Sequence, residues 1–230
     1  MKFFTNFPPI SFIIFYSSST SINLWEVNFS FPYLISSIIF DLETNGLQDS
    51  SVLSVSAFKY SIDTETLKLK FLDKFTRYYY PTEEYNARAI AVNGLSEDVV
   101  EELRGEADYP EFFCEDSGFY IFIADVDHLI GHNISFDYSF LSDRTKEYNT
   151  YCTMLATTNI LKIPHQYRRR GYKYPKLMEV AEYYNIELEE DKLHDSDYDV
   201  ELTVKIFENL CQEEYEKERI KDFLLEDDIY

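Results

Sequence analysis

The chain has 230 residues, which is enough for one domain with a sizeable core, or for one domain with an extension. Its composition is 45% hydrophobic and 17% aromatic, which excludes a largely disordered chain. The formal net charge of −21 argues against a broad basic face that grips nucleic acid, so any such contact should be a short footprint on a strand end. Cys114, Cys152 and Cys211 lack the spacing of a zinc site and predict reduced thiols in a cytoplasmic protein.

The first 33 residues differ from the rest, since their only charged residues are Lys2 and Glu26. The adjacent prolines Pro8 and Pro9 interrupt the start of a possible secretion signal. The uncharged run 3–25 has too many Ser, Thr, Asn and Pro residues for a membrane span. We therefore expect residues 1–33 to be an appendage or an unneeded upstream start. Packing on a partner or on the core, and targeting, are the alternatives.

The predicted domain begins at residue 34 with the apolar run LISSIIF, a buried strand that leads into Asp41. The β-rich runs 52–60 and 67–78 predict a hairpin, and a second buried strand is predicted at 126–131. Helices are predicted at four places: a short one capped by Ser96, then 136–144, 153–161 and 176–184.

A final helix is predicted from Ser196, because Val200, Val204, Phe207 and Cys211 recur at three- and four-residue intervals. The charge-rich stretch 213–230 is expected to be a solvated helix end or tail. Strands come early and then alternate with helices, so residues 34–212 predict a single α/β domain with a mixed sheet covered on both faces.

Asp41 and Glu43 stand two residues apart at the end of the first predicted strand, so both carboxylates point to one face and can share a cation. Alone, this pair would be more typical of a solvated surface. The same spacing occurs at Asp63 and Glu65, but in a predicted turn.

Two further motifs follow in order. In HNISFDYSFL, Asp137 lies near the start of a predicted helix, where an acidic residue is favoured by the helix dipole in any case. We expect His132 and Asn133 to order the loop rather than to bind metal. In KLHDSDYDVEL, Asp199 opens the last helix and His194 precedes it, although a surface His near an acid is unremarkable by itself.

The ordered combination is specific. It resembles the DEDDh 3′–5′ exonucleases of the DnaQ-like family, which includes the proofreading subunit of bacterial DNA polymerase III, ribonuclease T and oligoribonuclease. The resemblance covers residues 34–210 and includes the segments 82–100 and 171–186. It departs from the family pattern at Ser196, which is usually Ala, and at Cys152, which is usually Asp.

The resemblance implies a ribonuclease-H-like fold with a central mixed five-stranded sheet, and two Mg²⁺ or Mn²⁺ ions. It implies that Asp41, Glu43, Asp137 and Asp199 bind the metals and that His194 is the general base. The related branch has Tyr four residues before the last Asp, where this chain has Asp195, so the His branch is favoured.

The substrate should be the 3′ end of a nucleic acid, released as 5′-mononucleotides. Thr44, Asn133 and Phe136 lie beside the motif carboxylates and are expected to contact it. The basic segment with Arg168, Arg169, Arg170 and Lys173 is interleaved with tyrosines, which suits phosphate contacts and base stacking on a single strand. A solvated charged loop is the alternative for this segment.

Several functions stay open at this point. Single-stranded DNA is preferred as substrate, but an RNA-directed exonuclease fits the same motifs, because they bind phosphate and metal and not the sugar. A non-catalytic module recruited to a polymerase or nuclease complex is another alternative. A metal-binding acidic protein without hydrolytic activity would leave His194 unexplained.

Overall fold

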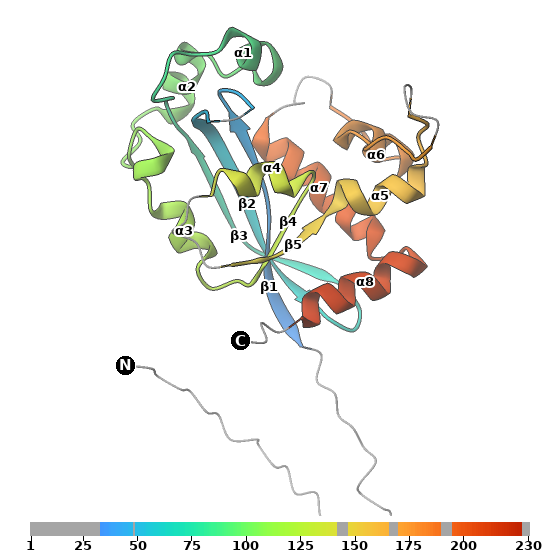
Figure 1. The fold of residues 1–230 in the computed structure, drawn as a ribbon. Helices are drawn as coiled ribbons and strands as arrows, with labels where there is room; N and C mark the ends of the chain where they lie inside the picture. Colours follow the sequence, from blue (N-terminus) through green and yellow to red (C-terminus); the bar gives the residue numbers. More distant parts are fainter. Residues whose placement is uncertain (1–32, 48, 142–146, 166–169, 190–194, 227–230) are drawn as a thin grey trace, which may run out of the picture. The chain divides into compact units, whose positions relative to one another are not determined.

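The computed structural model describes residues 33–47, 49–141, 147–165, 170–189 and 195–226 (Figure 1). Within them, five strands form one mixed sheet in the order β3-β2-β1-β4-β5. The α/β class and the five-stranded sheet expected from the sequence are thus confirmed. Except for Tyr33, the expected appendage lies outside the described residues.

The central strand β1 (Leu34–Thr44) pairs antiparallel with β2 (Val52–Asp63) and parallel with β4 (His128–Gly131). Strand β3 (Leu69–Tyr78) pairs antiparallel with β2, and β5 (Asn149–Cys152) pairs parallel with β4. The C-terminal ends of the three parallel strands therefore lie at one edge of the sheet, where loops and helix starts can meet.

Helices cover both faces of this sheet (Figure 1). Their bounds are α1 Ala87–Asn93, α2 Glu97–Arg104, α3 Gly118–Ile123, α4 Ile134–Ser139, α5 Thr153–Leu161, α6 Leu177–Tyr183, α7 Ser196–Leu210 and α8 Glu214–Leu225, with a 3-10 helix at Phe113–Glu115. Helix α5 has the predicted bounds. Helix α4 begins two residues earlier than predicted, after Asn133, which has the left-handed φ of 65°. Residues 142–144 of the predicted helix lie outside the described part of the chain.

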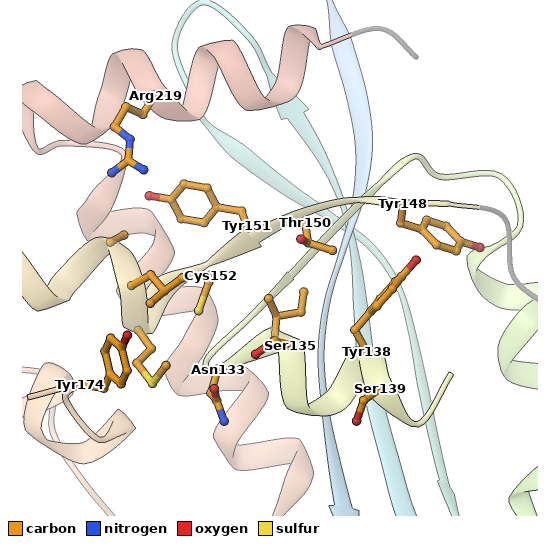
Figure 2. A pocket seen from close by; sticks show the side chains of 14 residues that line it. Asn133, Ser135, Tyr138, Ser139, Tyr148, Thr150, Tyr151, Cys152, Tyr174 and Arg219 are labelled. Carbon is orange, nitrogen blue, oxygen red and sulfur yellow. The ribbon is translucent and has the colours of Figure 1, made fainter. Parts of the chain in front are cut away.

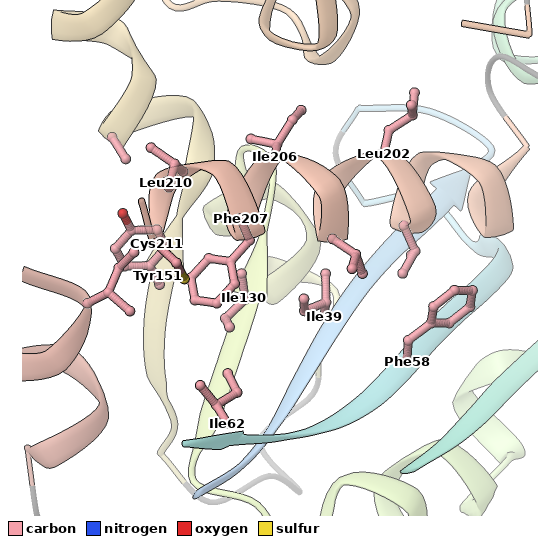
Figure 3. Packing of buried hydrophobic residues seen from close by; sticks show 14 of the residues in the cluster. Ile39, Phe58, Ile62, Ile130, Tyr151, Leu202, Ile206, Phe207, Leu210 and Cys211 are labelled. Carbon is pink, nitrogen blue, oxygen red and sulfur yellow. The ribbon is translucent and has the colours of Figure 1, made fainter. Parts of the chain in front are cut away.

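Alternate residues of β1 enter two separate cores, as the period of two in a strand requires. Ile39 packs with Ile130 of β4 under the side of α7 that presents Phe207 (Figure 3). Ile38, Phe40 and Leu42 face the opposite core with residues of α3 and α4. The strand that carries the first acidic motif is therefore fixed from both sides.

The solvated end expected from Glu213 onward is instead a packed helix. Helix α8 buries Ile220, Phe223 and Leu224 in the same core as α7. Its Glu216 is also buried, accepting a 2.9 Å hydrogen bond from the Tyr151 hydroxyl. The prediction failed because the many charges of this segment hide an apolar stripe at helical spacing. None of the helices in the described ranges is long and apolar enough to cross a membrane.

Phe223→Ala should lower the free energy of unfolding by about 3–5 kcal/mol, because it empties a site packed against Tyr151 and His128. Leu225→Ala is the matched control on the same helix, since Leu225 is 54% exposed, and it should change stability by less than about 0.5 kcal/mol. Urea denaturation measures both. Equal and small effects would mean that α8 is a solvated tail after all.

Candidate active site

The end of β1 presents the two carboxylates of the first motif on one face. Asp41 lies opposite Ser56 of β2, and Glu43 lies opposite Ser54. Both point to the side of the sheet that Ile39 shares with α7, because residues two apart in a strand have the same orientation. The register shifts between Glu43 and Thr44, so the regular pairing ends beyond the second carboxylate.

Helix α7 brings Asp199 to this pair. Asp195 caps the helix by accepting the Asp197 N–H at 3.0 Å, and the Asp199 N–H donates to the Asp195 carbonyl at 2.9 Å. One carboxylate oxygen from each of Asp41, Glu43 and Asp199 lies within 4.8 Å of the other two. The structure thus gathers three acidic side chains from two distant segments.

Asp137, the fourth predicted carboxylate, is buried in α4 beside Asp41. Its Oδ1 accepts the backbone N–H of Leu42 at 3.1 Å, which ties α4 to β1 between the two motif acids. It is not part of the group of three, but its charge is the largest electrostatic influence on Asp41. Asp137 does lie in the first turn of α4, and its carboxylate is buried beside the other motif acids.

Crowding and burial hold protons on this cluster. Burial, followed by the charges of Asp137 and Glu43, raises the pKa of Asp41 well above its usual range. Burial and the charge of Asp199 raise the pKa of Glu43 to about 8, although a hydrogen bond from Asn93 opposes this. Burial raises the pKa of Asp137 to about 7.

Carboxylate oxygens in this number are the ligands that hard divalent cations prefer. A bound cation would cancel the repulsion that raises these pKa values. The donor set therefore fits a divalent-metal centre, and Asp41, Glu43 and Asp199 are the side chains able to share one ion.

A pocket of about 630 Å³ adjoins Glu43. Its walls come from the end of β1, the following turn, helix α1 and Phe136 of α4. The residues that line it include Leu47, Arg88, Val92 and Asn93. The volume suits a ligand of nucleotide size.

A hydrogen-bond network holds α1 against the end of β1. The Asn45 side chain donates to Glu83 at 2.8 Å and accepts the Asn86 N–H at 2.8 Å. At the other end of α1, Asn93 donates to the Thr44 carbonyl at 3.1 Å. Asn93 and Arg88 are site residues that the sequence motifs did not predict. The only available signal was their place in the segment 82–100, which matches the family without a defined motif.

The predicted substrate residues near the carboxylates divide between two pockets. Phe136 and Thr44 line the pocket beside Glu43, and the Thr44 hydroxyl donates to the Gly46 carbonyl at 2.6 Å. Asn133 instead lines a neighbouring pocket of about 760 Å³, across from Arg219 (Figure 2). His132 orders its loop as expected, by contacting the Thr153 hydroxyl and the Pro175 carbonyl at 3.0 Å each.

His194, Arg168 and Arg169 lie outside the described residues. Arg170 is exposed. Lys173 forms an ion pair with Glu179 at 2.5 Å, so its charge is partly neutralised within the protein.

An acidic cluster at the end of the central strand of such a mixed sheet is the arrangement expected of a metal-dependent nuclease with a ribonuclease-H-like fold. The family model for the RNase_T exonucleases matches residues 38–207. The chain therefore belongs to the RNase_T exonuclease family and is a 3′–5′ exonuclease, which confirms the resemblance seen in the motifs.

Solved structures agree on the fold. Exonuclease X in complex with 5′-overhanging duplex DNA superposes with a TM-score of 0.52 at 19% identity, over 82% of this chain and 99% of that one. E. coli exonuclease I in complex with a dA16 oligonucleotide gives a TM-score of 0.53 at 14% identity, over 82% of this chain but 42% of that one.

A third structure, of 3′-end-specific recognition of histone mRNA stem-loop by a 3′-exonuclease, gives 0.55 at 15% identity, over 80% and 84% of the two chains. At these identities the likeness shows the fold alone. No curated protein matches the sequence.

Mg²⁺ or Mn²⁺ should stabilise the fold, and more so at high pH. The pKa of Glu43 is raised in the folded protein relative to the unfolded chain. Its contribution to the free energy of unfolding is therefore fully present below the unfolded carboxyl pKa of about 4. In metal-free protein this contribution is lost as the pH rises through about 8. A metal concentration of 100 times the dissociation constant should add about 2.7 kcal/mol to the free energy of unfolding. Thermal unfolding with metal or chelator, at about pH 5 and about pH 8, measures the difference.

Asp41→Asn is the matched variant, because it removes one repelling charge and one candidate metal ligand while keeping the size of the side chain. It should melt at a higher temperature than the parent in chelator, and metal should shift its melting less. A parent melting temperature that neither metal moves would contradict the metal centre.

Proposed function

We propose that this protein hydrolyses the phosphodiester bond at the 3′ end of single-stranded DNA and releases 5′-mononucleotides, with two Mg²⁺ or Mn²⁺ ions bound. The observation that supports this most directly is the carboxylate cluster of Asp41, Glu43 and Asp199 within 4.8 Å beside a pocket of nucleotide size. Asp137 completes the set of four carboxylates as a proposed metal ligand from α4.

When bound, two cations would supply a hydroxide at neutral pH and positive charge for the attacking and leaving oxygens. The chain's own residues fix where this happens. Asp41 and Glu43 are held by the sheet, Asp137 by its hydrogen bond to the backbone of Leu42, and Asp199 by the capped start of α7. The acids are thereby placed before substrate arrives, which lowers the cost of ordering them.

His194 is proposed as the general base that takes a proton from the attacking water. It lies one residue before Asp195, the cap of α7, so it belongs to the segment that leads into the Asp199 helix. A general base of this kind contributes typically about 10²–10⁴-fold in rate. His194→Ala should cost activity in that range.

The pocket beside Glu43 is proposed to take the terminal nucleotide. Phe136, Leu47 and Val92 offer apolar surface for the base, and Leu47 and Val92 are 86% and 59% exposed. Arg88 supplies a positive charge and Asn93 an amide in the same wall. Stacking on such a surface is tolerant of base identity.

An RNA 3′ end is the second candidate substrate. Two of the similar structures hold DNA, whereas the third concerns a histone mRNA stem-loop, so relatives of this fold act at both kinds of end. The net charge of −21 makes the grip away from the site weak. This weak grip supports the further proposal that a polymerase partner delivers the strand end.

Digestion of 5′-labelled single-stranded DNA and RNA oligonucleotides with Mg²⁺ or Mn²⁺ tests the activity. We expect a ladder that shortens from the 3′ end, faster on DNA, with 5′-mononucleotides as product. Asp41→Ala, which removes a central ligand, should abolish the ladder. Faster digestion of RNA would assign the second candidate, and no digestion by folded, metal-bound protein would leave the non-catalytic module.

Replacing Arg168, Arg169 and Arg170 together by Gln should raise KM and leave kcat nearly unchanged, because these side chains are proposed to bind the strand and not the reacting phosphate. The slope of log(1/KM) against log[salt] should fall by about 0.7 for each phosphate of a single strand that the variant no longer neutralises. The control is Lys68→Gln with Lys70→Gln, which removes two positive charges at exposed positions where β2 leads into β3. Unchanged KM and salt dependence in the triple variant would remove these arginines from the substrate site.

A further inference from the structure

The first turn of α7 is tied to β2 by buried hydroxyl groups. Ser54 Oγ donates to Ser196 Oγ at 3.1 Å, and Ser56 Oγ lies 3.0 Å from the same oxygen. Ser54, Ser56 and Ser196 are each at most 2% exposed. The Ser196 side chain is therefore a hydrogen-bonded link between helix and sheet.

The next residue of α7, Asp197, extends this link to β3. Its Oδ1 accepts hydrogen bonds from Ser56 Oγ and Thr76 Oγ1, both at 2.6 Å. Its Oδ2 pairs with Lys74 Nζ at 2.5 Å. We call Ser54, Ser56, Thr76, Lys74, Ser196 and Asp197 the α7 clamp.

The serine hydroxyl groups of the clamp can all donate their hydrogen bonds in one direction, toward Asp197. Each hydroxyl has one hydrogen to donate. If Ser56 donates to Asp197, then Ser196 donates to Ser56 and Ser54 donates to Ser196. The row of hydroxyls then ends on a carboxylate, which makes the last hydrogen bond charge-assisted and strengthens those before it.

The clamp uses the same rungs of the sheet as the catalytic acids. Ser56 lies opposite Asp41 on β1 and opposite Thr76 on β3, while Ser54 lies opposite Glu43. Side chains directly opposite in a sheet share a face. One transverse row thus carries Asp41, then Ser56, then Thr76, and the start of α7 is laid across it.

This arrangement opposes a force that the site itself creates. Asp199 is two residues beyond Asp197 in the same turn, and its negative charge repels those of Asp41 and Glu43. Without restraint, that repulsion would push the start of α7 away from β1. The clamp holds this turn against β2 and β3, and β2 is the strand next to β1.

We propose that Asp197 is a positioning residue of the exonuclease, which holds Asp199 against Asp41 and Glu43 and so sets the affinity of the site for divalent cations. The inference rests on the proposed metal-dependent function. Asp197 itself contacts Ser56, Thr76 and Lys74 and acts through the backbone of α7.

Titration calorimetry with Mn²⁺ tests this in the full-length protein. Asp197→Ala should weaken Mn²⁺ binding about 10–100-fold, the usual cost of losing a group that orients a metal ligand. Asp197→Asn should lose less, because its amide oxygen can still accept from Ser56 and Thr76. Glu201→Gln, an equal charge change at an exposed site of α7, should bind Mn²⁺ like the parent.

The second arm removes the other side of the clamp. Thr76→Val should weaken Mn²⁺ binding in the same direction, and adding it to Asp197→Ala should cost less than the sum of the two single effects. Lys74→Gln, at a 41% exposed side chain, tests the link if Asp197→Ala does not fold. The Mn²⁺ concentration for half-maximal digestion should rise in parallel, with kcat at saturating Mn²⁺ much less affected.

Folded Asp197→Ala and Lys74→Gln variants that bind Mn²⁺ like the parent would overturn the inference, even if both melt at lower temperature. A parent that binds Mn²⁺ but digests no oligonucleotide would overturn the proposed function while leaving the clamp to be judged by the binding data. A parent that binds no Mn²⁺ would overturn both.

Discussion

The mutual repulsion of the carboxylates gathered at the end of β1 governs how the surrounding structure is built. Asp41, Glu43 and Asp199 approach within 4.8 Å, with Asp137 buried beside them. Such a cluster is unfavourable until protons or cations neutralise it, and the raised pKa values report that cost. The fold tolerates it because each acid belongs to an element that is anchored elsewhere.

The anchoring comes from both faces of the sheet. Ile39 joins the core under α7, while Ile38, Phe40 and Leu42 join the core under α3 and α4. Because β1 is enclosed in this way, the positions of Asp41 and Glu43 follow from the packing of their neighbours. Helix α8 adds to the first core by burying Phe223 and Leu224, so a segment dominated by charge supports the site from a distance.

A strongly acidic protein can act on nucleic acid if it contacts only the end of a strand. In the proposed mechanism bound cations attract the phosphate, and the pocket beside Glu43 combines apolar side chains with polar ones, which include Asn93 and one arginine, Arg88. Such a surface would suit a strand end and would offer little attraction to a long duplex. The charge that argues against broad binding is thus consistent with an enzyme confined to termini.

The sequence alone predicted the order of the three motifs, because acids at strand ends and helix starts have a local signature. That order in turn indicated the family, the five-stranded sheet and the carboxylates of the site. Helix α5 could also be located in this way, since its start and end are local. The sequence did not reveal α8, whose apolar stripe is diluted by charge, nor the short elements α1, α3 and β5. That Asn93 borders Glu43 and that Asp197 meets Thr76 emerged only from the folded chain, because those contacts join residues 50 and 121 positions apart. Contacts at such separations are set by the register of the sheet and by the packing of helices on it. Neither can be predicted from a local sequence pattern.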